Sequence, residues 1–291
     1  DAVSRGLDVD AFAPRLSFFF NCHNDFFEEV AKFRAARVLW HDLMVDRYAP
    51  KHPKSSMLRF HTQVAGVSLT AQQPLNNIAR VAIQALAAVC GGKQSLHTNS
   101  YDEALGLPTE ASATVALRTQ QIIAEESGAA DVVDPLGGSY HVERLTSLMI
   151  EEVKQELERI ASKGGALKAV EAGYQQREIH KAVFAHQRAL ETGERSIVGV
   201  NVHMMDESTS PPVQTIDADL ARAQETRLNN VREQRDSERT NRALADLERV
   251  AGTEENIFPL VLEAVRAEAT VGEICGVLRK VFGEYTPPSG F

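Results

Sequence analysis

Residues 59–63 read Arg59-Phe60-His61-Thr62-Gln63, and residues 94–103 read Gln94-Ser95-Leu96-His97-Thr98-Asn99-Ser100-Tyr101-Asp102-Glu103. Each stretch begins like a short strand and ends in polar, ring-bearing or acidic side chains. Enzymes built on parallel α/β sheets present their functional groups at the carboxyl ends of the strands. The two stretches therefore predict an α/β enzyme whose site lies at these strand ends.

Strands and helices alternate through the first half of the chain. We predict strands over 16–20, 57–62 and 94–98, and helices that begin at Asn24 or Asp25, cover Asn77–Cys90, and follow Pro108-Thr109. This βαβαβα order requires a parallel sheet, either open or closed into a barrel. A full eight-stranded barrel needs roughly 250 residues of its own. We therefore expect a small open sheet with a helical cap, or the last part of a barrel whose earlier strands lie on sequence before Asp1.

Helical patterns dominate after the turn Asp134-Pro135-Leu136-Gly137-Gly138. We expect helices from Leu145 onward, one further strand over 196–202, a solvated helix over 215–250 with i,i+4 ion pairs, and an amphipathic helix over 271–281. The Pro- and Ser/Thr-rich stretch 207–214 predicts an exposed linker. The expected domains are 1–133 as the strand–helix part, 134–206 as an α-rich segment, 207–214 as the linker, and 215–291 as a helical C-terminal region.

Composition narrows the functional class. The 291 residues are 43% hydrophobic, which is ordinary for a globular protein, and their formal net charge is -9. The basic residues are dispersed, which argues against nucleic-acid and anionic-membrane partners. No apolar run approaches the ~20 residues that span a bilayer. The cysteines, Cys22, Cys90 and Cys275, are far apart, and no secretory signal is present. We therefore expect buried thiols and a cytoplasmic location.

Five motifs, taken in order along the chain, resemble the family of methylmalonyl-coenzyme A mutase and related acyl-CoA mutases. They are Arg15-Leu16-Ser17-Phe18-Phe19-Phe20-Asn21, Arg59 to Gln63, Leu69-Thr70-Ala71-Gln72-Gln73-Pro74, Gln94 to Ala104, and Asp134 to Tyr140. The family fold is a TIM (β/α)8 barrel that binds the acyl-CoA thioester along its axis, with adenosylcobalamin across one end. The resemblance implies a partial TIM barrel, made of the last strands, followed by a mostly helical C-terminal region.

The resemblance assigns substrate-binding roles at the first and third strands. Arg15, Ser17 and Phe19 match positions that contact the coenzyme A portion, and an arginine suits a phosphate because its planar fork donates two hydrogen bonds. Phe19 has an alternative role as a core residue. Gln94 and Ser95 are expected to line the same cavity.

The resemblance places the cofactor-binding residues at the second and third strands. His61, Gln63 and Gly66 match positions that face the corrin, where a glycine lets the backbone approach a flat macrocycle. Glu103 and Gly106 match positions on the cobalamin side, and the Glu103 carboxylate offers acceptors to the ribose hydroxyls of the adenosyl group. Relatives often carry alanine where this chain has Gly106.

Lys54 and Asn99 are the only candidates for catalytic residues in the chain. Lys54 matches a family active-site lysine, although a solvated surface lysine fits its position equally well, and Asn99 is expected to line the cavity. His97 is expected either in the cavity or behind the site. The family's Asp-x-His-x-x-Gly motif, which supplies the lower axial histidine of cobalamin, has no counterpart because no Asp-x-His occurs here. We therefore predict no metal ligand in this chain and a cobalamin-binding domain downstream or on a small partner subunit.

The implied reaction is an adenosylcobalamin-dependent radical 1,2-rearrangement, and the favoured substrate pair is (R)-methylmalonyl-CoA and succinyl-CoA. Isobutyryl-CoA or another branched acyl-CoA is the alternative, because the Tyr, Arg and His that grip the migrating group belong to the front of the barrel. A hypothesis of another class is an inactive assembly module that docks a separate cobalamin-binding subunit. The isolated chain is expected to be an inactive part of the large subunit that associates with itself or with a partner, because its sheet edge is open.

Overall fold

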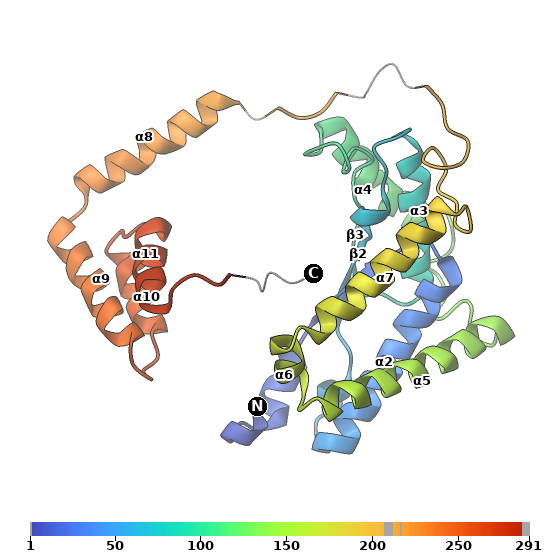
Figure 1. Ribbon diagram of the computed structural model, residues 1–291, viewed down its shortest axis with the longest axis horizontal. Helices are drawn as coiled ribbons and strands as arrows, with labels where there is room; N and C mark the ends of the chain where they lie inside the picture. Colours follow the sequence, from blue (N-terminus) through green and yellow to red (C-terminus); the bar gives the residue numbers. More distant parts are fainter. Residues whose placement is uncertain (1, 207–211, 216, 287–291) are drawn as a thin grey trace. The chain divides into compact units, whose positions relative to one another are not determined.

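The computed structural model describes residues 2–206, 212–215 and 217–286. The chain folds into two compact units, Asp1–Gln214 and Thr215–Phe291, which we describe separately (Figure 1). The first unit is a mixed α/β structure, mostly helical, with a small parallel sheet. The second unit is helical in its described residues.

The first unit alternates strand and helix up to Glu125 and is helical beyond it. Its strands are β1 (Phe18–Cys22), β2 (Phe60–Val64) and β3 (Ser95–His97). Its α-helices are α1 (Val9–Phe12), α2 (Phe26–Tyr48), α3 (Asn76–Cys90), α4 (Glu110–Glu125), α5 (Tyr140–Ser162), α6 (Ala166–Glu171) and α7 (Tyr174–Glu191). Short 3-10 helices are η1 (Val3–Arg5), η2 (Ala13–Arg15), η3 (Pro53–Ser56) and η4 (Gly66–Ser68).

The sheet has the order β1-β2-β3, and both strand pairs are parallel. The predicted strands therefore exist, but the first two begin later than expected, at Phe18 and Phe60. The predicted strand residues before them, 16–17 and 57–59, are irregular and directly follow the 3-10 turns η2 and η3. The Asp10 carboxylate holds the second of these turns, because it accepts hydrogen bonds from the backbone nitrogen of Lys51 at 2.8 Å and from Ser55 Oγ at 2.6 Å. No local pattern reveals a contact that joins residues so far apart in the sequence.

Helices α2 and α3 cover one face of the sheet with an aromatic and aliphatic core. The fully buried ring of Phe33, on α2, stacks on Phe60 of β2 with centroids 5.4 Å apart and meets Phe20 of β1 edge-on at 6.2 Å. A side-chain cap at Asp25, which accepts from the Glu28 nitrogen at 3.2 Å, begins α2 as predicted. This packing buries the even-numbered side chains of β1 and β2 and leaves the odd-numbered ones for the other face.

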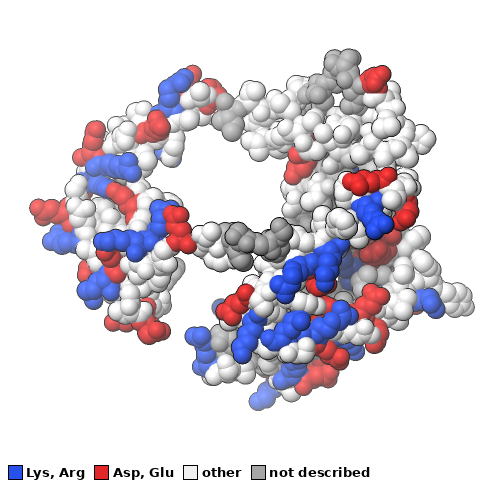
Figure 2. All heavy atoms as spheres, viewed as in Figure 1, with Lys and Arg blue, Asp and Glu red and all other residues white. Residues whose placement is uncertain are grey.

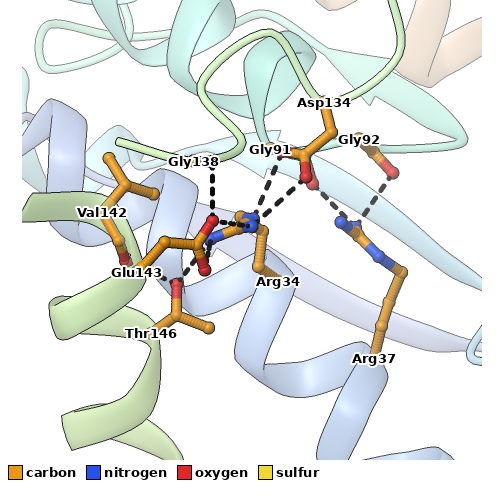
Figure 3. Close-up of polar contacts among 9 residues, drawn as sticks. All are labelled: Arg34, Arg37, Gly91, Gly92, Asp134, Gly138, Val142, Glu143 and Thr146. Carbon is orange, nitrogen blue, oxygen red and sulfur yellow. Dashed lines mark hydrogen bonds and ion pairs between the residues drawn. The ribbon is translucent and has the colours of Figure 1, made fainter. Parts of the chain in front are cut away.

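Helix α5 lies along α2, and Arg34 joins them (Figures 1 and 3). Its guanidinium group donates to Glu143, in the first turn of α5, at 2.8 and 3.2 Å, and to Asp134 in the preceding turn at 3.2 Å. These hydrogen bonds lower the pKa of the Glu143 carboxyl. Arg37, one turn along α2, donates to the carbonyl of Gly91 at 2.7 Å and so satisfies the end of α3. The motif at residues 134–140 therefore has a structural role.

The predicted strand over 196–202 is wrong. This segment is a turn that contains a single isolated bridge between Val198 and Val202. The side chain of Asn201 closes the turn, because its Oδ1 accepts from the Ile197 nitrogen at 2.7 Å and its Nδ2 donates to the Leu190 carbonyl at 3.0 Å. The β-branched residues there gave a strand-like pattern, whereas the asparagine contacts decide the conformation.

The second unit contains α8 (Ala218–Gln234), α9 (Ser237–Ala251), α10 (Phe258–Arg266) and α11 (Val271–Phe282). The single solvated helix predicted over 215–250 is wrong, because Asp236 caps a new helix by accepting from the Arg239 nitrogen at 3.0 Å. Helix α9 is also not solvated all round. Its fully buried Leu247 packs with Ala264 and Ile274 from the next two helices. The ion pairs within α8 and α9 have i,i+3 rather than i,i+4 spacing.

Cys22 and Cys90 are buried, as predicted, whereas Cys275 is exposed. The predicted linker 207–214 lies partly outside the described residues, and residues 212–214 are exposed and irregular. On the face in Figure 2, basic and acidic side chains are intermixed over both units. No helix in the described part of the chain is both long and apolar enough to cross a bilayer.

Acid is expected to destabilise the second unit through one ion pair. Arg235, whose side chain is 9% exposed, donates to both carboxylate oxygens of Glu273 at 2.7 and 2.5 Å. These hydrogen bonds, followed by one from the Thr270 nitrogen, overcome desolvation and lower the pKa of Glu273 from 4.5 to about 2. The folded state thus favours the ionised form. Its contribution, roughly 2–3 kcal/mol, is complete above pH 4.5 and is lost as the pH falls toward 2.

The measurement is hydrogen exchange of the α9 and α11 amides, corrected for intrinsic rates, between pH 7 and pH 2. Arg235→Gln is expected to lower protection at pH 7 by about 2 kcal/mol and to make little difference at pH 2. Arg266→Gln is the matched control, because its pair with Glu263 is exposed on both sides and is worth little. Equal protection of the parent chain at pH 7 and pH 2 would contradict this prediction.

Candidate active site on the open face of the sheet

The face of the sheet opposite α2 and α3 carries two rows of side chains. In a parallel sheet, residues in register point to the same face. Phe19, His61 and Ser95 form the first row, nearer the amino ends of the strands. Asn21, Gln63 and His97 form the second row, nearer the carboxyl ends. All six are at least partly exposed, and Phe19 is 60% exposed.

The first row is ordered by contacts between neighbouring strands. His61 Nδ1 lies 2.7 Å from Ser95 Oγ, and the ring of Phe19 lies 5.1 Å from the imidazole, tilted against it. The hydroxyl and the aromatic ring fix the orientation of the imidazole. The second ring nitrogen of His61, Nε2, has no hydrogen-bond partner in the part of the chain that the structure describes, so it can serve a ligand.

Above the second row, the structure brings Gln63, Gly66, Asn99 and Glu103 together. Gln63 Nε2 donates to Asn99 Oδ1 at 2.9 Å, and Asn99 Nδ2 donates to the Val64 carbonyl at 3.1 Å. A Cβ atom on Gly66 would lie 2.8 Å from Asn99 Nδ2 and 3.5 Å from the Glu103 carboxylate. Asn99 is 2% exposed, whereas Glu103 is exposed. Gly66 thus provides clearance between a buried amide and an accessible carboxylate.

The loop that carries Glu103 and Gly106 is closed by Asp102. This fully buried carboxylate accepts from the Thr109 nitrogen at 3.3 Å, and its backbone carbonyl accepts from the nitrogens of Leu105 and Gly106 at 2.8 and 3.1 Å. Gly106 is exposed, and a Cβ atom there would meet only Val213, at 3.8 Å. Thr109 then caps α4, as predicted. The loop is therefore held at both ends.

The remaining predicted residues lie nearer the amino ends of the strands. Arg15, Ser17 and Lys54 precede β1 and β2 and are exposed. The structure does not bring Lys54 to the group around Asn99, because it lies in η3, before β2. Gln94 Oε1 accepts from the backbone nitrogen of Phe60 at 2.8 Å, which extends the pairing between β2 and β3 by one bond.

Two further positions belong to this face. His97 is exposed and in register with Gln63, so of its two expected places the structure favours the open face over a position behind it. Asn21 was not singled out, although it stands beside Gln63 and ends the odd-numbered series of β1. The alternation of β1 would have indicated it, had the strand been extended beyond Phe20.

Other reactive groups are excluded from this face. The Cys22 thiol lies on the covered side of the sheet, where burial, followed by the Glu29 charge, raises its pKa far above the ordinary range. It donates to the Gln84 carbonyl at 3.1 Å and is therefore not an activated nucleophile. Among the described residues, no group of three or more His, Cys, Asp or Glu side chains could hold a metal ion.

Comparison of the sequence with known proteins places the chain in a family. A family model described as methylmalonyl-CoA mutase matches residues 1–284. The chain belongs to the methylmalonyl-CoA mutase family. It is 46% identical over 284 residues to the "Probable methylmalonyl-CoA mutase, mitochondrial" of Caenorhabditis elegans, covering 97% of this chain and 38% of that protein. It is 44% identical over 289 residues to the Escherichia coli methylmalonyl-CoA mutase, covering 99% of this chain and 40% of that protein.

A further relative is named for a different substrate. The "2-hydroxyisobutanoyl-CoA mutase large subunit" of Aquincola tertiaricarbonis is 45% identical over 289 residues, which cover 98% of this chain and 51% of that protein. The chain thus spans about two fifths to one half of the length of these curated mutase-family relatives. The expected membership of the acyl-CoA mutase family is confirmed.

Proposed function

We propose that this chain forms the last strands of a TIM barrel and the following helical region in the large chain of an adenosylcobalamin-dependent acyl-CoA mutase. The proposed reaction interconverts (R)-methylmalonyl-CoA and succinyl-CoA. The proposed segments are 1–133 for the barrel part, 134–206 for the α-rich segment, 207–214 for the linker and 215–291 for the helical region. Family membership and the names of the mutase relatives support the reaction class.

The single observation that supports the site is the order of groups along the open face. The candidates for coenzyme A, Arg15, Ser17 and Phe19, lie at or before the amino end of β1. The candidates for the cofactor, Gly66 and Glu103, follow the carboxyl ends of β2 and β3. A long thioester that runs along the strands would therefore meet cationic and aromatic groups at one end and the cofactor candidates at the other. Gln94 and Ser95 belong to the amino-end group.

The residues at the carboxyl ends fit a corrin with an adenosyl group. Gly66 leaves room that a Cβ atom would fill, and Gln63 holds its amide at a fixed place through Asn99. Gln63 would hydrogen-bond the amide periphery, and the accessible Glu103 carboxylate would accept from the ribose diol. His61, in the row nearer the amino ends, would reach the same periphery with its second ring nitrogen. Gly106 would lie on the same side, at a position where an added methyl group makes only an ordinary contact with Val213. When bound, adenosylcobalamin supplies radical chemistry by homolysis of its cobalt–carbon bond.

The chain's own residues would bind and orient the substrate and exclude water. The imidazole of His61, fixed by Ser95 and Phe19, offers one ring nitrogen to a ligand. Asn99 is proposed as a support for Gln63 rather than a reacting group, since both its amide atoms are engaged. No step is assigned to Lys54. A cobalamin-binding domain or small subunit would supply the protein ligand of the cobalt, and a cytoplasmic location is proposed for the assembly.

The similarity to the 2-hydroxyisobutanoyl-CoA mutase large subunit favours a second candidate, in which the substrate is another branched acyl-CoA and the cobalamin domain is a separate chain. A third candidate is an assembly module without its own activity.

One experiment separates these candidates. The intact protein that carries this chain is combined with a cobalamin-binding subunit and adenosylcobalamin, and is assayed with methylmalonyl-CoA, isobutyryl-CoA and 2-hydroxyisobutyryl-CoA. We expect succinyl-CoA to form at least tenfold faster than either other product, and no turnover by residues 1–291 alone. Faster conversion of isobutyryl-CoA or 2-hydroxyisobutyryl-CoA would establish the second candidate. Absence of turnover with all three substrates would refute the mutase proposal.

A further inference from the structure

Helix α3 carries two fully buried amide side chains on the face that packs against the sheet. Asn77 and Gln84 are both 0% exposed. They are seven residues apart, which is close to two helical turns, so they lie on one face with the buried Val81 between them. Burying an amide between a helix and a sheet costs desolvation free energy that an apolar side chain would not cost. Two amides on this face therefore require an explanation.

Gln84 joins the loop after β1 to the loop after β2. Its Nε2 donates to Asn24 Oδ1 at 2.5 Å and to Ser68 Oγ at 2.6 Å. The Ser68 hydroxyl donates its hydrogen bond to the Ala65 carbonyl at 2.6 Å, so its oxygen acts only as an acceptor toward Gln84. This relay braces the turn from Ala65 to Ser68, which contains Gly66.

Asn77 joins the loop after β2 to the loop after β3. Its Oδ1 accepts from the Thr70 nitrogen at 3.1 Å, and its Nδ2 donates to the Thr70 and Tyr101 carbonyls, both at 2.8 Å. Tyr101 is two residues before Glu103. The amide therefore braces the loop that places the carboxylate, from the side away from the open face.

We propose that Gln84 and Asn77 are positioning residues. Because both lie on the rigid helix α3, their hydrogen bonds hold the three loops that follow the strands in one arrangement. The loops after β2 and β3 carry Gly66 and Glu103. The inference rests on the proposed function, in which these two residues contact the cofactor. The contacts of Gln84 favour positioning over simple packing. Its buried amide nitrogen donates to side chains of two different loops, and this is the arrangement that a brace between loops requires.

The test is Gln84→Met in the intact protein assembled with its cobalamin-binding subunit or domain. Methionine keeps the volume and the apolar stem but cannot donate. We expect the melting temperature of the assembled protein to stay within about 3 °C of the parent. The Kd for adenosylcobalamin, read from the corrin spectrum, should rise about tenfold. A change of this size corresponds to the free energy of one good hydrogen bond, here lost from the loops. KM for the acyl-CoA should change by less than about twofold, because the coenzyme A candidates lie at the other end of the strands.

Two further variants separate positioning from packing. Ser68→Ala removes the relay from the loop side and should raise the Kd in the same direction, with the melting temperature unchanged. The Val81 side chain lies between the two amides and makes no hydrogen bond to a loop. Val81→Ala should therefore lower the melting temperature by several degrees, while the Kd for adenosylcobalamin stays within about twofold of the parent. A Kd for Gln84→Met equal to that of the parent would overturn the proposal. An equal rise of the Kd in Gln84→Met and Val81→Ala would also overturn it.

A second readout keeps this inference distinct from the proposed function. Hydrogen exchange of the amides in residues 65–69 should accelerate about tenfold in Gln84→Met and Ser68→Ala, without ligand, and stay unchanged in Val81→Ala. If the parent protein binds no cobalamin, the proposed function fails, and the exchange data still decide whether Gln84 braces the loop. If the parent binds and the exchange is unchanged in Gln84→Met, the positioning role is refuted.

Discussion

Phe33→Ala is expected to lower the free energy of unfolding of the first unit by about 3–5 kcal/mol. The ring is fully buried and stacks on Phe60 at an interplanar angle of 9°. It also fills the space under Gly91, where a Cβ atom would lie 2.6 Å from the Phe33 ring. Removing it leaves a cavity between the sheet, α2 and the end of α3, where Arg37 holds the last carbonyls. The loss therefore includes both transfer and cavity energy.

Trp40 makes this measurement selective. It is the single tryptophan of the chain and lies on α2, with its ring 4.8 Å from that of Phe18, so its fluorescence in a urea titration follows the first unit and not the second. Phe27→Ala is the matched control, because this α2 ring is 46% exposed and should cost less than about 1.5 kcal/mol. Similar losses for the two variants would mean that the Phe33 site collapses without a cavity.

The elements of the first half could be predicted because their signals are local. The Asp25 and Thr109 caps each lie within three residues of the backbone nitrogen that they accept from. Where the prediction was wrong, either a distant side chain decides the structure or a local side-chain contact acts without a helix-breaking residue to signal it. Asp10 fixes the turn before β2, more than 40 residues further on. In the second unit, Asp236 caps a helix inside a charged run that has no glycine or proline to indicate a break.

The candidate site could also be predicted only in part from the sequence. The residue types at the strand ends were visible, but their grouping depends on register. His61 and Ser95 are 34 residues apart and meet because β2 and β3 pair with His61 opposite Ser95. A buried amide such as that of Gln84 is hard to recognise from sequence, because a glutamine in an Ala-rich helix is typical of a solvated position. Its burial follows from the side of α3 that packs on the sheet.

Gly66→Ala is expected to weaken adenosylcobalamin binding by the assembled protein about 10- to 100-fold. The added Cβ atom would lie 2.8 Å from Asn99 Nδ2, closer than real contacts allow, and the buried Asn99 cannot move without losing its bond to Gln63 or to the Val64 carbonyl. Each such loss costs about 1–3 kcal/mol, which corresponds to the expected change in Kd.

Gly106→Ala adds the same methyl group in the neighbouring loop, where its nearest contact is Val213 at 3.8 Å. It should change the Kd by less than about threefold, because an ordinary van der Waals contact requires no rearrangement. Titration of the corrin spectrum with both variants measures the difference. If Gly66→Ala binds as tightly as Gly106→Ala, then the clearance between Asn99 and Glu103 is not what the cofactor requires, and the proposed corrin face must lie elsewhere on the sheet.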